Sequence, residues 1–304
     1  MSLPTTIKQW TTAQDGLENL TQTTAPLPTP GPDEVLVKIR TVSLNYRDTE
    51  PGGKGEKVLI QGTGGVAVSG LQIAHASGAE GIDHYLFLGC EARVSEEVGS
   101  GQNYQLRMAI NGMRPLGQPG GKGEKVLIQG TGGVAVSGLQ IAHASGAEVI
   151  ITSSSDAKLE LAKKLGADRT INYKTIPNWD EEVLKMTDDE GVDIIFENGG
   201  AQTVQKSFEC VAFGGLINCI GYLSGKQDAA DDRTNINVLA LKRNVTLKGL
   251  LNGPRERLEE MLQFYDEKKI YPVVDKVFGF EESKEALIYL SKGGHFGKVV
   301  IKVD

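Results

Sequence analysis

The chain has 304 residues, 39% of them hydrophobic and 23% charged, which is typical of a globular protein with two ordinary domains. Its formal net charge is −7 and no basic stripe follows the sequence, which argues against nucleic-acid binding through phosphate neutralisation. No apolar run reaches the roughly 20 residues that span a bilayer, so we expect no membrane partner.

Cysteine usage and the polar N-terminal segment favour the cytoplasm. The three cysteines, Cys90, Cys210 and Cys219, are odd in number and widely spaced, as expected of free thiols in a reducing compartment. The segment MSLPTTIKQW has no apolar signal core. We therefore expect a cytoplasmic protein whose partner is a small-molecule substrate.

The two ends of the chain predict one small β-rich domain. Residues Glu34–Val42 alternate between apolar and polar, as a half-buried antiparallel strand does, and a proline-rich turn precedes them. Near the other end, Ala286–Leu290 predicts a helix and Lys298–Val303 an alternating strand. The simplest arrangement is a domain built from both ends, with an α/β domain inserted between them.

A perfect repeat interrupts the chain after this first segment. Residues 51–80 recur unchanged at 119–148. Repeat proteins keep a pattern while their sequence drifts, so we interpret the copy as a recent duplication, an engineered splice or a gene-model error. Only His84–Leu88 has strand character after the first copy, whereas regular elements follow the second.

Strand and helix signals alternate from about residue 124 to about residue 220. Short apolar runs predict strands at Val149–Thr152, Ile171–Tyr173, Asp193–Phe196 and Leu216–Ile220. Helical spacing predicts helices over 159–165, which Gly166 would end, and over Trp179–Met186. This alternation predicts a parallel sheet covered by helices on both faces. Farther on, Asn244–Leu251 predicts an edge strand that pairs with its copy in a homodimer.

A glycine-rich turn lies at the start of this alternation. Lys125–Gln129 predicts a strand, and the G-x-G-x-x-A sequence from Gly130 to Ala135 leads into a helix that ends near Ala144. Glycine lets the backbone approach a pyrophosphate, and a helix N-terminus attracts its charge. The alternative is a turn that binds nothing, but the alternation that follows favours a nucleotide site. Its predicted contacts are Gly130, Thr131, Gly132, Gly133 and Val134.

The end of the next strand decides the predicted cofactor. NAD sites carry Asp or Glu there, which holds the ribose 2′-hydroxyl. Here the strand ends in Thr152-Ser153-Ser154-Ser155, and Lys158 follows in the next turn. Hydroxyl donors and a lysine suit a 2′-phosphate, so the sequence predicts NADP. Ser155 or Asp156 would alternatively cap the following helix, a role that is compatible with phosphate binding.

The chain resembles the medium-chain dehydrogenase/reductase superfamily, and in particular its zinc-free quinone-oxidoreductase-like and zinc-type alcohol dehydrogenase-like members. The resemblance rests on VSLNYRD (42–48), KVLIQGTGGVAVSGLQIA (125–142), SSSDAKLELAKKLGAD (153–168), INYK (171–174), GVDIIFENGG (191–200), GGLINCIGYLSG (214–225) and GGHFGKVVI (293–301). It implies an α/β fold: a Rossmann doubly wound parallel sheet plus a truncated GroES-like β-barrel domain. The implied map gives 1–50 and 270–304 to the incomplete catalytic domain, 51–107 to the duplicated and unplaced segment, and 108–269 to the NADP-binding domain.

The resemblance also implies roles for single residues. Asn45 stands where zinc-dependent relatives place a cysteine, and in zinc-free relatives it lies near the nicotinamide. Ser153, Ser154 and Lys158 would face the 2′-phosphate, and Tyr173 the adenosine ribose. The positions that line the family's cofactor cleft correspond to Asn198, Gly221, Tyr222 and Lys298.

No metal site is predicted. Catalytic zinc needs about three Cys, His or carboxylate ligands, and His84 with Cys90 is only a chance pair in the unplaced segment. Tyr46 is the candidate proton donor beside Asn45, with packing as its alternative role.

Two functions follow from these observations. The first is an NADPH-dependent oxidoreductase that transfers hydride to a quinone, an enone or a related carbonyl-activated substrate without zinc. The second is a nucleotide-binding remnant with no turnover, because the stretch after Asp48 that would complete the barrel and the substrate pocket is missing.

Overall fold

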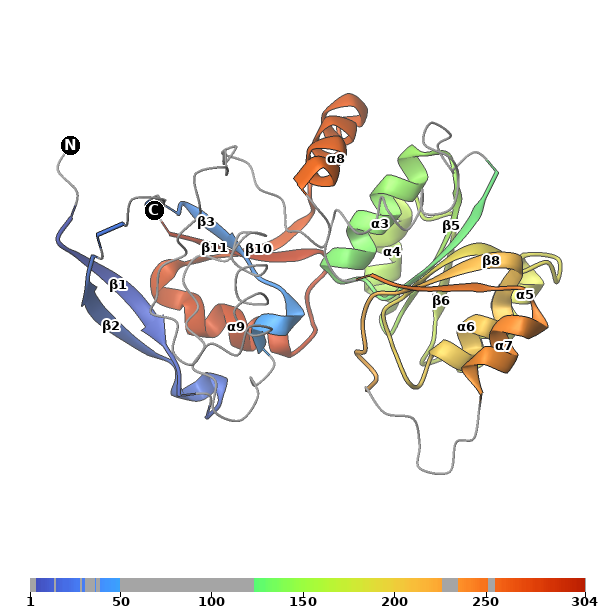
Figure 1. Ribbon diagram of the computed structural model, residues 1–304, viewed down its shortest axis with the longest axis horizontal. Helices are drawn as coiled ribbons and strands as arrows, with labels where there is room; N and C mark the ends of the chain where they lie inside the picture. Colours follow the sequence, from blue (N-terminus) through green and yellow to red (C-terminus); the bar gives the residue numbers. More distant parts are fainter. Residues whose placement is uncertain are drawn as a thin grey trace. The chain divides into compact units, whose positions relative to one another are not determined.

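The computed structural model describes residues 4–13, 15–27, 29–30, 36, 39–49, 123–225, 235–250 and 255–303. The chain divides into two compact units, Met1–Gly101 with Val274–Asp304, and Gln102–Val273 (Figure 1). The predicted domain boundaries near 50, 107 and 269 stay predictions. No described helix is long and apolar enough to cross a membrane, and the cytoplasmic location also stays a prediction.

The second unit is built on a parallel sheet. Its described strands are β4 (Lys125–Gln129), β5 (Glu148–Ser153), β6 (Arg169–Asn172), β7 (Val192–Glu197), β8 (Val211–Cys219) and β9 (Thr246–Gly249). Their order in the sheet is β6-β5-β4-β7-β8-β9, and every pair of neighbours is parallel. The order runs outward from β4 to β6, then reverses and runs outward from β7 to β9. This is the doubly wound arrangement that the sequence predicts.

Helices cover both faces of this sheet (Figure 1). Helices α3 (Gly133–Ala144) and α4 (Asp156–Lys164) lie on one face, and α5 (Trp179–Met186), α6 (Val204–Cys210) and α7 (Ile236–Lys242) lie on the other. Right-handed crossovers require this division, because the direction of strand addition changes after β6. The last helix of the unit is α8 (Arg255–Lys268).

The core on the α5–α7 face comes from alternate residues of the strands. Leu127, Ile195 and Ile217 point to this face and are fully buried, and Trp179 and Phe208 pack on them from the helices. Because helices bury both faces, the central strands β4, β5 and β7 each contain three consecutive buried apolar residues, as parallel strands usually do. Cys210 and Cys219 are free thiols, and burial raises the pKa of both, so the sulfurs are held protonated.

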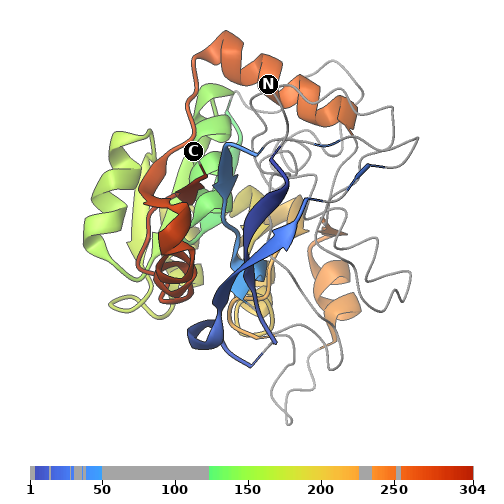
Figure 2. The same cartoon turned by 90° about the vertical axis from the view of Figure 1, so that its left-hand side faces the viewer.

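The first unit combines both ends of the chain. It contains β1 (Thr6–Thr11), β2 (Thr21–Pro26), β3 (Thr41–Ser43), β10 (Val274–Gly279), α9 (Ser283–Ser291), β11 (Lys298–Lys302) and the 3₁₀ helices η1 (Leu17–Asn19), η2 (Tyr46–Thr49) and η3 (Phe280–Glu282). β1 and β2 form an antiparallel hairpin, dark blue in Figure 2, and β11 lies between β10 and β3 in a second sheet. Apolar residues of β3, β11 and α9 share one core, to which Val42, Ile301 and Leu287 belong. The predicted union of the two chain ends is therefore confirmed in the described residues.

The sequence predicts one strand over Glu34–Val42 and another at His84–Leu88. The strand expected over Glu34–Val42 is wrong in extent: among the described residues only Thr41–Ser43 is a strand, because only this segment meets β11. Residues 31–35 and 37–38 lie outside the described part, as do the first repeat copy and the strand expected at His84–Leu88.

Candidate functional site

The glycine turn follows β4 at the point where the strand order reverses. Gly130 has φ +84°, a conformation that side chains disfavour, and an added Cβ there would meet nothing within 4 Å. Its amide donates to the Thr152 carbonyl at 2.9 Å, which ties the turn to the end of β5. The turn is therefore fixed in shape and open on one side. In doubly wound sheets the ligand binds at this reversal of strand order.

Helix α3 begins at this turn without a side-chain cap. Its N-cap residue is Gly132, which makes no side-chain hydrogen bond to the first amides of the helix. An uncapped helix start offers N–H groups and a positive dipole end to an anion. The observed bounds of β4 and the observed end of α3 at Ala144 are the predicted ones, and because α3 begins at Gly133, Gly133 and Val134 stand in its first turn.

The hydroxyl-rich end of β5 lies beside the glycine turn. Ser153 is buried, and its Oγ lies 3.3 Å from Oγ1 of Thr131. Ser153 also accepts a hydrogen bond from the Tyr173 amide at 3.1 Å, so the ends of β4, β5 and β6 meet here, and the Tyr173 side chain is 42% exposed. Ser154 follows directly after β5, and the half-buried Lys158 lies in the first turn of α4.

The serine at the start of α4 does not cap the helix with its side chain. Ser155 is the N-cap residue, but its side chain makes no cap hydrogen bond. The Asp156 carboxylate accepts from Nδ2 of Asn172 at 2.8 Å. The first carboxylate after β5 in the sequence is therefore hydrogen-bonded to the end of β6, and the residues at the end of β5 itself are Thr and Ser.

The turns after β7 and β8 hold three more predicted residues, Asn198, Gly221 and Tyr222. The Asn198 carbonyl accepts from the Leu223 amide at 3.1 Å, and a Cβ at Gly221 would lie 2.7 Å from the same carbonyl oxygen. The two turns are in close contact, and glycine is required at 221. Sequence reasoning missed the buried Glu197 beneath them. A charged residue that ends an apolar strand just before two glycines was the signal for it.

The first unit contains a separate polar pair, Asn45 and Lys298. Both side chains are buried, and Lys298 Nζ donates to Asn45 Oδ1 at 2.7 Å. The Asn45 amide N–H donates to Oδ2 of Asp48 at 2.7 Å, which holds Asn45 at the start of η2. These residues come from opposite ends of the chain, and the pairing of β3 with β11 brings them together.

Burial lowers the pKa of the Lys298 amine. Desolvation lowers the pKa of Lys298 from 10.5 to about 8, and the negative charge of Asp48 offsets part of the effect. An amine with such a pKa can hold or release a proton near neutral pH. Tyr46, the candidate donor from the sequence, is 44% exposed at the start of η2, so Lys298 is a second candidate that contacts Asn45 directly.

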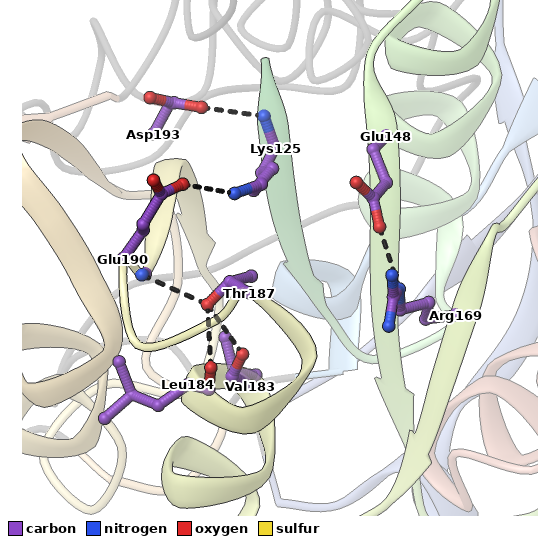
Figure 3. Close-up of polar contacts among 9 residues, drawn as sticks. Lys125, Glu148, Arg169, Val183, Leu184, Thr187, Glu190 and Asp193 are labelled. Atoms are coloured by element: carbon purple, nitrogen blue, oxygen red, sulfur yellow. Dashed lines mark hydrogen bonds and ion pairs between the residues drawn. The ribbon is translucent and has the colours of Figure 1, made fainter. Parts of the chain in front are cut away.

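The opposite, amino-terminal edge of the sheet has structural contacts of another kind (Figure 3). Lys125 Nζ lies 2.7 Å from the Glu190 carboxylate and its backbone amide donates to Asp193, while Arg169 pairs with Glu148 at 2.8 Å. These are solvent-exposed ion pairs, which typically contribute little to stability. These contacts lie at the starts of the strands, whereas the glycine turn and the serines lie at the carboxyl ends, so the carboxyl ends are the candidate site.

The strand order, the crossovers and the uncapped glycine turn define the second unit as a Rossmann-type domain. A family model described as zinc-binding dehydrogenase matches residues 133–267 of this chain. The chain is 44% identical over 182 residues to a zinc-type alcohol dehydrogenase-like protein of Schizosaccharomyces pombe, a match that covers 60% of this chain and 52% of that relative. The chain thus spans about half the length of this curated relative.

Two further comparisons extend over almost the whole chain. Prostaglandin reductase-3 of Mus musculus is 26% identical over 328 residues, covering 91% of this chain and 83% of the relative. A solved alcohol dehydrogenase structure from Sinorhizobium meliloti 1021 superposes with a TM-score of 0.72 at 27% identity, covering 99% of this chain and 100% of that one. In sequence and fold the chain is similar to zinc-type alcohol dehydrogenase-like proteins and reductases, in agreement with its resemblance to the medium-chain dehydrogenase/reductase superfamily.

The family description names zinc, but the described residues do not fit that metal. No three His, Cys, Asp or Glu side chains converge within the described ranges. At the position of Asn45 the neighbouring group is the Lys298 amine, which carries a positive charge below its pKa and would repel a divalent cation. We therefore derive no zinc-dependent step.

Proposed function

We propose that this protein is an NADPH-dependent oxidoreductase that reduces a quinone, an enone or a related carbonyl-activated substrate without zinc. The observation that carries the proposal is the uncapped glycine turn at the reversal of strand order, next to a β5 end that has serines in place of a carboxylate. The similarity to prostaglandin reductase-3 and to alcohol dehydrogenase-like proteins supports the reaction class.

The residues of the second unit fit a dinucleotide phosphate. The amides at the start of α3 would hold the pyrophosphate, with Gly130 allowing its approach. Ser154 and Lys158 would hold the 2′-phosphate, and Tyr173 would lie at the ribose. Charge-assisted contacts of this kind contribute about 1.5–3 kcal/mol, so we expect NADPH to bind at least about tenfold more tightly than NADH.

The bound cofactor would supply a hydride, and the first unit would supply the groups that receive the resulting negative charge. Lys298 donates to Asn45 Oδ1 and thereby fixes the orientation of the Asn45 amide, whose Nδ2 lies 3.4 Å from the Ser43 carbonyl. Nδ2 has a second N–H, which would donate to the substrate oxygen as charge develops there. A proton from the Lys298 ammonium, passed through water, or from Tyr46 would then complete the reduction.

The test is NADPH titration together with turnover of a quinone and an enone. The repeat provides a matched control: Gly133→Asp places a carboxylate at the start of α3, and Gly65→Asp makes the same change at the equivalent position of the first copy. We expect Gly133→Asp to abolish NADPH binding and Gly65→Asp to leave it unchanged. Loss of binding in Gly65→Asp alone would refute the placement of the site.

A second candidate function is a nucleotide-binding remnant without turnover. It is favoured by the repeat at 51–80, which stands where relatives continue the barrel, and by the half-length match to the Schizosaccharomyces pombe relative. NADPH binding with no turnover of either substrate class would establish the remnant and exclude the reductase.

We also propose that the protein is a homodimer that pairs through β9. Among the described residues β9 has a neighbour, β8, on one side only, so its other edge offers unpaired backbone groups. Leu247 on this strand has an exposed apolar side chain, as have Val238 and Leu241 on α7, which directly precedes β9 in the chain. Two such edges would pair across a two-fold axis.

A further inference from the structure

A buried carboxylate lies below the turns of the Rossmann-type unit and has no part in the chemistry above. Glu197, the last residue of β7, is 1% exposed, and Gln129, the last residue of β4, is 8% exposed. The two strands are neighbours at the point where the strand order reverses. Burying a carboxylate is costly unless hydrogen bonds replace its water, so the donors around Glu197 show what the residue organises.

Five donors surround the two oxygens of Glu197, and none of them is charged. Oε1 accepts from the amides of Gly199 and Gly200, both at 2.9 Å, and from Thr203 Oγ1 at 2.5 Å. Oε2 accepts from Gln129 Nε2 at 2.7 Å and from Ser207 Oγ. The two glycine amides and Gln129 Nε2 can only donate, and they lie against different oxygens of Glu197, so both side-chain oxygens at this position must accept.

Gln129 continues the same arrangement. Its Oε1 accepts from the amides of Asn198 and Gly199, both at 3.1 Å, and its backbone carbonyl accepts from Asn198 Nδ2 at 2.8 Å. Three consecutive backbone amides, 198 to 200, thus point at two side chains below them. The turn after β7 is shaped by this pair of side chains, and Gly200 accordingly adopts φ +91°.

The turn after β7 is hydrogen-bonded to the turn after β8 and holds it in place. The Ser224 amide donates to the Gly199 carbonyl at 2.6 Å, and the Ile220 amide donates to the Glu197 carbonyl at 2.9 Å. A Cβ at Gly200 would lie 2.7 Å from the Gly225 carbonyl oxygen, so the two turns leave no space between them. A shift of the first turn would therefore displace the second.

We propose that Glu197 is a positioning residue: with Gln129, its carboxylate sets the shape of the turns after β7 and β8, which receive the nicotinamide half of the dinucleotide. This inference rests on the proposed function. The two halves of a doubly wound sheet each receive one mononucleotide, and the adenosine half lies at β4 and β5. Glu197 therefore acts on one half of the cofactor and not on the other.

The test exploits that asymmetry with two probes, NADPH and its adenosine fragment 2′,5′-ADP. In Glu197→Gln the amide N–H₂ must face either the glycine amides or the Gln129 N–H₂, which can only donate, whichever way the amide turns. We expect NADPH affinity to fall at least tenfold, whereas 2′,5′-ADP affinity stays within twofold of the parent. A merely structural role would weaken both probes together, and that result, like unchanged NADPH affinity, would overturn the proposal.

A double variant that exchanges the two side chains should restore the NADPH binding that Glu197→Gln loses. In Gln129→Glu/Glu197→Gln the carboxylate moves to position 129, where it still accepts the Asn198 and Gly199 amides. The new amide at position 197 keeps its oxygen for Thr203 and the glycine amides, and donates its N–H₂ to the moved carboxylate and to Ser207. We expect NADPH affinity within threefold of the parent. The single change Gln129→Glu is the matched control and should weaken NADPH binding, because it sets two buried carboxylates side by side.

Hydrogen exchange of the cofactor-free protein separates this inference from the proposed function. Glu197→Gln should speed exchange of the amides at 199, 200 and 224 at least tenfold, and the double variant should restore slow exchange. If Glu197→Gln does not fold, the double variant decides: slow exchange with NADPH binding supports the proposal, and failure of either overturns it. A parent chain that binds neither NADPH nor 2′,5′-ADP would refute the proposed function, while parental exchange rates in Glu197→Gln would refute the positioning role alone.

Discussion

Replacing Lys298 by methionine should remove a pH dependence of folding that the parent protein carries. The pKa of Lys298 is about 8 in the folded chain and 10.5 as its ordinary value. Between these values the unfolded chain holds more protons than the folded one, so the free energy of unfolding rises with pH. Below pH 8 the lysine is charged in both states and its burial cost is fully present. As the pH rises from about 8 to 10.5 the buried lysine loses its proton, and the free-energy cost of burying its charge disappears.

The size of this effect follows from the shift. A difference of 2.5 pKa units corresponds to about 3 kcal/mol, of which about 2.5 kcal/mol is relieved between pH 7 and pH 10. Methionine has no such dependence. It also leaves Asn45 Oδ1 without its 2.7 Å donor, which costs about 1–3 kcal/mol at every pH, so the net change at pH 7 lies between about zero and 2 kcal/mol of stabilisation. The informative quantity is therefore the change with pH.

The assay is urea unfolding of the first unit, monitored by tryptophan fluorescence at pH 7, 8, 9 and 10. Trp10 belongs to this unit and donates to the Phe280 carbonyl at 2.9 Å, so a Trp179→Phe background isolates its signal. Lys302→Met, an exposed change on the same strand, is the control and should keep the parent pH dependence. A parent curve that is flat from pH 7 to pH 10, or equal slopes for Lys298→Met and the parent, would refute the argument.

Three other expectations can be checked with simpler measurements. Lys158→Glu should erase the tenfold preference for NADPH over NADH, measured by titration with both cofactors, and a retained preference would contradict the 2′-phosphate assignment. Leu247→Arg should halve the mass found by light scattering at micromolar concentration, and a monomeric parent would count against the dimer. Gly191→Ala should lower the unfolding free energy by at least about 1 kcal/mol more than Gly123→Ala, since both have φ above +80° but only at 191 would the Cβ meet backbone, at 2.7 Å. Equal losses in thermal unfolding would contradict this.

The elements that the sequence predicts well are those whose burial and local pattern agree. The strand Lys125–Gln129 and the helix Trp179–Met186 have the predicted bounds, since an apolar run or a helical period ends there at a polar or glycine residue. The alternation over Glu34–Val42 predicts too long a strand, because pairing with β11 depends on residues more than 250 positions away.

In the candidate site, too, the sequence predicts local features but not contacts between residues far apart in the chain. The glycine turn and the serines after β5 are local signals and could be read directly. The contact between Gln129 and Glu197 joins residues 68 positions apart, and the contact between Asn45 and Lys298 joins opposite chain ends. Resemblance placed Asn45 and Lys298 near the cofactor, but their mutual hydrogen bond and the lowered pKa needed the tertiary structure.

The central position of β4 has a consequence for folding kinetics. β4 is the strand on which both halves of the sheet are built, and the thirty residues that contain it occur twice in the chain. Because their sequences are identical, the two segments have the same intrinsic preference for a strand, and both would compete to pair with β5 during folding. In the second copy residues 130–147, which include α3, separate β4 from β5. Residues 57–61 of the first copy, which correspond to β4, would have to close a loop 68 residues longer, which costs on the order of 1.5 kcal/mol more. Chain order alone therefore favours the second copy by roughly tenfold, and the remaining molecules would begin with the wrong strand at the centre and refold slowly.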